Sequence, residues 1–129
     1  MSAVILADRD PLYAWFVTEA LLAVGVPVTW FRSATPAVAL AAAGDGDRLL
    51  LMDAGTWLAD AVPGAAAGPL PGAHAVLLGW ESDRRPPDGF TVEREKPGDA
   101  GALRRLVAAA SGSRPGAVAP PEQSPQGAG

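Results

Sequence analysis

Five short apolar runs recur along the chain, separated for the most part by segments with helical spacing. They lie within segments 2–8, 26–31, 48–55, 73–80 and 90–97. The first, third and fourth are apolar at nearly every position, which is typical of strands buried on both faces of a parallel sheet. Strands that alternate with helices are joined by right-handed crossovers and acquire helices on both faces. The pattern predicts a doubly wound, flavodoxin-like α/β fold, with a parallel five-stranded sheet in the order 2-1-3-4-5.

Capping residues followed by proline mark the beginning of two helices. Asp10 precedes Pro11 and Thr35 precedes Pro36, as in the N-cap and N1 positions of a helix. Gly25 is placed to end the first of these helices. The apolar residues of this helix follow helical spacing at Leu12, Trp15, Phe16, Leu22 and Val26. Trp15 is therefore expected in the core or at its rim.

Helix signals are weaker in the second half of the chain. Proline and glycine interrupt segment 56–72 from its middle onward. Segment 81–89, ESDRRPPDG, has no apolar periodicity, so a loop or a single helical turn is predicted there. The fourth helix of the fold is thus expected to be short or missing. Segment 98–111 predicts a closing helix with its large apolar residues on one face.

The composition changes at residue 112. Residues 112–129 are rich in proline, glycine, serine and glutamine and contain no large apolar side chain. Such a segment cannot bury enough surface to offset its chain entropy. We predict one folded domain at 1–111, followed by a disordered tail at 112–129.

Charge, cysteine content and hydropathy narrow the class of protein. The net charge of -4 disfavours direct binding of nucleic acid, because proteins that bind it usually carry a basic face. The chain has no cysteine, which suits a reducing cytoplasm. It also lacks the features of a signal peptide, and no segment approaches the roughly 20 apolar residues that span a bilayer. We expect a cytoplasmic protein without a nucleic-acid or membrane partner.

Three acids and the only lysine are predicted to gather at one edge of the sheet. Asp8 and Asp10 flank Arg9 directly after the first strand, and Asp53 ends the third. The predicted strand order places these two strand ends side by side at the switch point, where ligands bind in such sheets. Lys96, which is followed by a proline, comes after the fifth strand.

These residues resemble the receiver domain of bacterial two-component response regulators, over residues 3 to about 110. Asp8 in ILADRDP matches the first of the family's two metal-binding acids. Asp53 in LLLMDAG matches its phosphoacceptor, and Lys96 in EKPGD matches its lysine. The resemblance implies Mg²⁺ held by acids at this edge and signalling through a partner protein.

Two departures from the family's pattern bear on function. Arg9 occupies the position of the second acid, the principal metal ligand. Gly79, or Leu78 if the register shifts by one, occupies the position of a hydroxyl residue. Arg9 removes a ligand for Mg²⁺ and adds a fixed positive charge. Its side chain either pairs with Asp53 or Asp10 in place of the metal or points to solvent.

The leading hypothesis is therefore a degenerate receiver, or pseudo-receiver: a non-enzymatic bacterial signalling module that acts through a partner protein. It needs no cofactor and has no firm catalytic residue, and Asp10 is expected to serve as a helix cap. The alternative is a phosphorylatable single-domain response regulator, with Asp53 as phosphoacceptor and Mg²⁺ bound by Asp8 and Asp53. A small flavodoxin-like enzyme or nucleotide binder is disfavoured, because DRDP offers acids and a proline where a phosphate cradle needs glycines and free N–H groups.

A partner surface is predicted in the loop after the fourth strand. Trp80 follows that strand in a loop too short to cover it well, and large aromatic residues often anchor interfaces. Arg84 and Arg85 are assigned to the same surface. The competing interpretation is that Trp80 caps the core where the missing helix would lie. The partner is expected to be another signalling or regulatory protein, with a homodimer as a further option.

Overall fold

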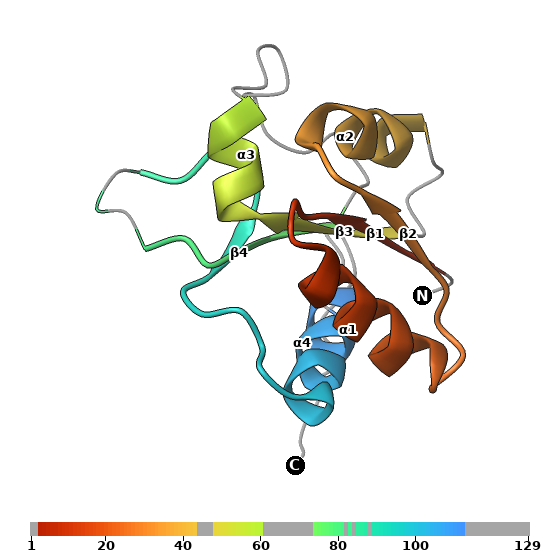
Figure 1. Cartoon of the computed structure of the whole chain (residues 1–129). Coiled ribbons are helices and arrows are strands. Elements are labelled where there is room, and N and C mark those ends of the chain that lie inside the picture. Colours follow the sequence, from red (N-terminus) through yellow and green to blue (C-terminus); the bar gives the residue numbers. More distant parts are fainter. Residues whose placement is uncertain are drawn as a thin grey trace.

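The computed structural model describes residues 3–43, 48–60, 74–81, 83, 85–87 and 89–112. Its strands are β1 (Ala3–Ala7), β2 (Val28–Phe31), β3 (Arg48–Asp53), β4 (His74–Leu78) and β5 (Thr91–Glu93). Its helices are α1 (Pro11–Leu22), α2 (Ala34–Ala43), α3 (Ala54–Asp60) and α4 (Ala100–Gly112), and Figure 1 shows their arrangement. All neighbouring strands are parallel, in the order β2-β1-β3-β4-β5. The predicted fold class is confirmed.

The connection from β4 to β5 is not helical wherever the structure describes it. The helix labelled α4 follows β5 and is the last helix of the fold. The prediction that the helix between β4 and β5 is short or missing is therefore confirmed within the described residues. Of the predicted tail, only Gly112 is described, and it ends α4. Residues 113–129 lie outside the described residues. None of the helices described has the length and hydropathy that a bilayer crossing requires.

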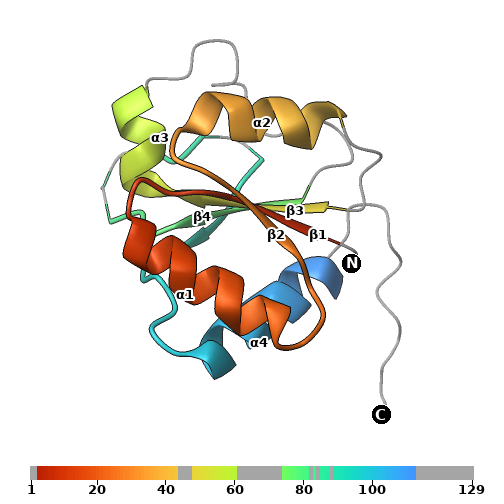
Figure 2. The same cartoon turned by 45° about the vertical axis from the view of Figure 1, so that its right-hand side comes forward.

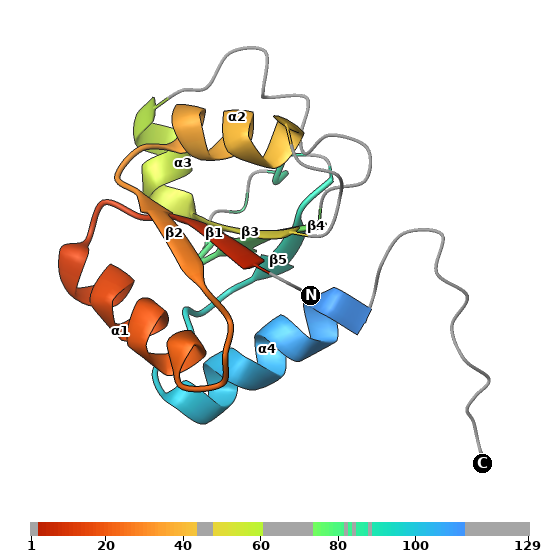
Figure 3. The same ribbon diagram turned by 90° about the vertical axis from the view of Figure 1, so that its right-hand side faces the viewer.

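Two helix layers cover the sheet, one on each face. Figure 2 shows α2 and α3 on one side of the strands and α1 and α4 on the other, and in Figure 3 α1 and α4 lie side by side. Alternate residues of β1 and β3 contribute to two separate core clusters: Val4, Leu6, Leu49 and Leu51 to one, and Ile5, Ala7, Leu50 and Met52 to the other. Burial on both faces explains why these strands are continuous apolar runs.

The register of β1 and β3 brings their carboxyl ends together. Ala7 pairs with Met52, so the next residue of each strand, Asp8 and Asp53, emerges at the same edge of the sheet. β4 ends at the same level, because Asp53 pairs with Leu78. The topology alone therefore places the two acids beside each other.

Helix α1 begins and ends where the sequence indicates, but it buries a different face from the one expected. The Asp10 carboxylate accepts a hydrogen bond from the N–H of Leu12 at 3.0 Å, and Gly25 follows the last turn with a φ of 81°. The core side consists of Ala14, Val17, Ala20 and Leu21. Three larger residues of the predicted apolar set point away from the core and are exposed: Leu12 (78%), Trp15 (66%) and Leu22 (59%). The prediction that Trp15 lies in the core or at its rim is wrong.

Trp80 is a core residue rather than a partly exposed anchor. Trp80 is only 6% exposed and belongs to the core cluster beneath α2 and α3. Gly79 turns the chain with a φ of 80°, and the N–H groups of Gly79 and Trp80 both donate to the carbonyl of Glu93, at 2.8 and 3.3 Å. This turn directs Trp80 back onto the sheet. The predicted exposure of Trp80 is thus wrong, and the competing interpretation, that Trp80 packs on the core, holds. Arg85 is exposed, and Arg84 lies outside the described residues.

Candidate functional site

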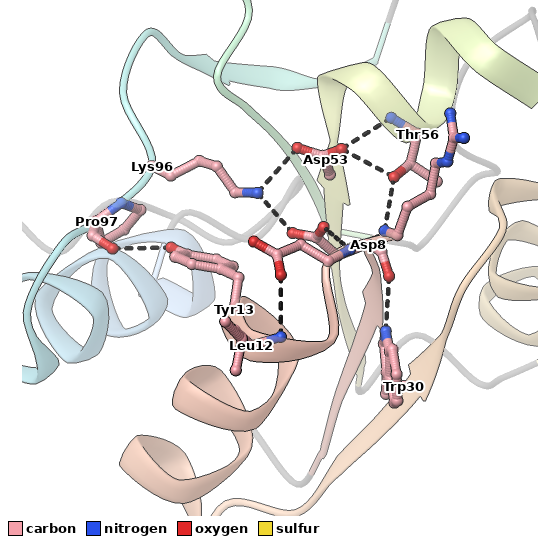
Figure 4. A network of polar contacts seen from close by, with 10 residues as sticks. Asp8, Leu12, Tyr13, Trp30, Asp53, Thr56, Lys96 and Pro97 are labelled. Atoms are coloured by element: carbon pink, nitrogen blue, oxygen red, sulfur yellow. Dashed lines mark hydrogen bonds and ion pairs between the residues drawn. The ribbon is translucent and has the colours of Figure 1, made fainter.

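Lys96 joins the two acids at the carboxyl edge of the sheet (Figure 4). Its Nζ lies 2.7 Å from Oδ2 of Asp8 and 3.0 Å from Oδ1 of Asp53. The lysine reaches this point from the segment after β5, and the two acids come from the ends of β1 and β3. The only lysine of the chain therefore forms a bridge between its two pocket carboxylates.

The second oxygen of Asp53 is held by Thr56, a residue that sequence reasoning missed. Oδ2 of Asp53 accepts hydrogen bonds from both the N–H and the hydroxyl of Thr56, each at 2.8 Å. The same hydroxyl oxygen accepts a hydrogen bond from the N–H of Arg9 at 3.0 Å. An acid directly before a helix with a threonine three residues later is a capping pattern, so the spacing of Asp53 and Thr56 was a usable signal. Both oxygens of Asp53 thus have partners.

Asp8 is the most deeply buried acid of the site, at 1% exposure. Its Oδ1 accepts a hydrogen bond from the N–H of Asp10 at 2.9 Å, and its carbonyl accepts one from Nε1 of Trp30 at 2.7 Å. Burial raises the pKa of the Asp8 carboxyl above its ordinary value, and the hydrogen bonds from Lys96 and from the N–H of Asp10 offset only part of this rise. Asp8 therefore depends on its ion pair with Lys96 to stay ionised without a large loss of folding free energy.

Arg9 and Asp10 do not join the pair of pocket acids. Asp10 is exposed and caps α1 through the N–H of Leu12, as the sequence predicts. The side chain of Arg9 is exposed and forms no ion pair in the part of the chain that the structure describes. The prediction that Arg9 pairs with Asp53 or Asp10 is wrong. The alternative prediction, that the Arg9 side chain points to solvent, is confirmed. The cation that offsets the pocket charge is Lys96.

Tyr13 forms one wall beside the ammonium group. Nζ of Lys96 lies 4.2 Å from the centre of the Tyr13 ring, and the phenol donates a hydrogen bond to the carbonyl of Pro97 at 2.8 Å. Burial lowers the pKa of Lys96, but its hydrogen bonds to Asp8 and Asp53 outweigh that effect, and the net pKa is raised. Burial, and then the charges of the two acids, raise the pKa of the Tyr13 phenol.

The raised pKa of Tyr13 leads to a titration that the chain reports cleanly, because it has one tyrosine. The folded state favours the neutral phenol, so the stability that Tyr13 contributes is present below the unfolded pKa of 10.0 and is lost as the pH rises above it. Lys96 acts in the same direction above its unfolded value of 10.5. We expect tyrosinate absorbance to appear only together with the loss of far-UV circular dichroism. Half-formed tyrosinate near pH 10 in a chain with an intact spectrum would contradict this packing of Tyr13.

Gly79 provides backbone geometry and no hydroxyl. A Cβ added there would meet Cγ of Lys96 at 3.6 Å, an ordinary contact, so space does not require glycine. The φ of 80° at this position requires glycine, because residues with a side chain rarely adopt it. In the described pocket the hydroxyl nearest to Asp53 thus comes from Thr56, which lies on the helix that follows the acid.

Comparisons with known proteins bear on the fold. No family model matches the chain, and no curated protein matches it. Among solved structures, it is similar to the response regulator receiver domain (CheY-like) from Methylobacillus flagellatus. The two share 18% sequence identity and a TM-score of 0.62, over 85% of this chain and 98% of that one. The described sheet order and the arrangement of the helices thus have a counterpart among receiver domains.

Proposed function

We propose that this chain is a degenerate receiver domain, a non-enzymatic signalling module that acts through a partner protein without phosphorylation of Asp53. The observation that carries the proposal is the shortage of acids at the pocket: Arg9 stands where the receiver's second metal-binding acid belongs, and its side chain is exposed. Among the described residues, Lys96 bridges the two acids that remain, Asp8 and Asp53. With Thr56 on the other oxygen, Asp53 is held in a self-contained network of hydrogen bonds. The structural likeness to a receiver domain supports the signalling class.

The residues of the pocket do not fit a Mg²⁺ ion, which the receiver fold implies. Mg²⁺ demands near-octahedral oxygen ligands, with carboxylates among them. Here two carboxylates face each other across an ammonium group, Asp10 caps a helix, and Arg9 stands where a further acid would be needed. Among the residues described, no group of three or more His, Cys, Asp or Glu side chains is placed to hold a metal ion. The ammonium group of Lys96 offsets one of the two carboxylate charges.

A small-molecule phosphodonor tests the proposal directly. We expect the full chain, incubated with acetyl phosphate and Mg²⁺, to keep its unmodified mass, because the pocket lacks the ligands that would hold Mg²⁺ to neutralise an incoming phosphate. Intact-mass spectrometry measures the result. A phosphoryl mass increment that disappears in Asp53→Asn would overturn the degenerate reading and establish the phosphorylatable alternative.

Arg9→Asp is the matched gain-of-ligand variant for this test. The native chain is expected to bind Mg²⁺ with a Kd weaker than about 1 mM, and Arg9→Asp to tighten it by about tenfold. The side chain of Arg9 is exposed, so solvent screens most of the change in charge and the expected gain in affinity is modest. Arg105→Asp, at an exposed position on α4, makes the same change in net charge at a residue that forms no ion pair with Asp8 or Asp53 in the described part of the chain, and serves as control. Isothermal titration calorimetry measures the two Kd values.

A further inference from the structure

The outer side of α1 carries an apolar stripe that the fold leaves uncovered. It consists of Leu12, Trp15, Glu19 and Leu22, which we call the outer α1 stripe; all four are exposed. At about 100° per residue they fall within an arc of roughly 80°, on the side of the helix opposite its buried residues. The stripe therefore faces away from the sheet.

The exposed apolar area of this face is in the range of patches that mark interaction sites. With Val24, which is 53% exposed in the turn after α1, the three apolar stripe residues present on the order of 500 Å². The largest apolar patch of a typical monomer is about 300–600 Å² and often marks an interaction site. A helix that is apolar on both sides is normally buried on both sides. These observations indicate that another protein surface packs against the stripe.

We propose that the outer α1 stripe is covered by a second copy of this chain, with the two α1 helices antiparallel about a two-fold axis. The positions of the stripe are symmetric about Val17: Leu12 and Leu22 lie five residues to either side, and Trp15 and Glu19 two residues. Antiparallel pairing centred there sets each Leu12 against Leu22 of the second copy. It also sets each Trp15 against Glu19 of the second copy, as an isologous interface requires.

The chemistry of the central pair is complementary. The indole of tryptophan is only a donor, and the carboxylate of glutamate is only an acceptor. Within the part of the chain that the structure describes, neither the Trp15 nor the Glu19 side chain has a hydrogen-bond partner. Glu19 is also the only charged residue between residues 11 and 31, so two copies bring little like charge together. The two-fold axis forms the indole–carboxylate pair twice.

The area agrees with what a stable dimer needs. A standard interface buries about 800 Å² on each partner, and about 65% of a homodimer interface is apolar. The apolar part of such an interface is therefore about 520 Å² on each partner. This area is close to the roughly 500 Å² that the stripe and Val24 expose. The inference goes beyond the proposed function and does not depend on it, because self-association through this face needs neither the Lys96 ion pairs nor any particular state of Asp53.

Sedimentation equilibrium of the full chain tests the proposal. We expect a concentration-dependent dimer with a Kd in the micromolar range. Leu22→Arg should weaken it at least tenfold, because it places a charge in the apolar contact. Leu58→Arg is the matched control, since Leu58 is 50% exposed on α3, outside the stripe, and this variant should dimerise like the native chain. Circular dichroism confirms that each variant is folded.

Trp15→Phe separates the central pair from simple burial of apolar area. It retains an aromatic ring but removes the indole N–H, so the dimer should weaken by roughly three- to tenfold. A native chain that stays monomeric up to about 100 µM would overturn the proposal and leave the stripe to a foreign helix. A dimer unaffected by Leu22→Arg, or equally weakened by Leu58→Arg, would place the interface elsewhere and overturn it too.

Discussion

Trp80→Ala is expected to lower the free energy of unfolding by about 4 kcal/mol, in the range found when a buried tryptophan is truncated. The residue is almost fully buried in the cluster beneath α2 and α3, so its removal leaves a cavity that this part of the core cannot close. An aromatic residue on a partner surface would instead leave stability unchanged. Urea unfolding followed by circular dichroism measures the difference without relying on tryptophan fluorescence.

Trp15→Ala provides the matched control, because it removes the same side chain from an exposed position. At a protein concentration too low for self-association it should change the unfolding free energy by less than about 1 kcal/mol. A Trp80→Ala variant that is as stable as Trp15→Ala would show that Trp80 does not support the core.

The topology could be predicted because the sequence marks strands and helix starts with separate signals. Continuous apolar runs at 48–55 and 73–80 indicated buried parallel strands, and the Asp10–Pro11 pair indicated the start of α1. The Thr35–Pro36 pair was less accurate, because α2 begins at Ala34 and Thr35 lies inside the helix rather than at its cap. The absence of apolar periodicity in 81–89 indicated that the fourth helix would be lost, in agreement with the described part of that segment. Each of these signals is local, which is why one sequence suffices.

The orientation of α1 could not be predicted from spacing alone. Its sequence is apolar around most of the helix, so periodicity does not say which side faces the sheet. The small residues Ala14 and Ala20 lie on the buried side with Val17, where they let the helix approach the strands closely. Sequence reasoning favoured the larger residues, Leu12 and Trp15, and these are the ones that solvent reaches.

The pocket was predictable for the acids at the strand ends and, through the family resemblance, for Lys96, but not for the side chain of Arg9. The strand ends brought Asp8 and Asp53 together. Arg9 follows in the loop, where its N–H turns inward to Thr56 and its side chain outward, so the role expected of Arg9 belongs to Lys96. Residue type gives no hint of this choice, since either cation could have offset the acids.

Lys96→Met is expected to lower the free energy of unfolding at pH 7 by about 3 kcal/mol. Removing one partner of a buried ion pair costs about 3–5 kcal/mol, because the other charge stays buried and unpaired. We take the low end of that range because the Lys96 side chain is 27% exposed. Asp8, at 1% exposure, would be left with only the N–H of Asp10 as its partner on the side chain. Urea unfolding of the two chains at matched concentration measures the loss.

The pH dependence of stability and a double variant test whether unpaired Asp8 causes the loss of stability in Lys96→Met. Because burial already raises the pKa of Asp8, its charged form costs the folded state stability once the pH exceeds the unfolded value of 3.8. Without Lys96 that pKa should rise further, so the deficit of Lys96→Met should shrink as the pH falls and Asp8 takes up a proton. Asp8→Asn combined with Lys96→Met removes the charge at every pH and should recover most of the loss at pH 7. A deficit that is independent of pH and persists in the double variant would mean that Lys96 stabilises the fold by packing against Tyr13 rather than by its charge.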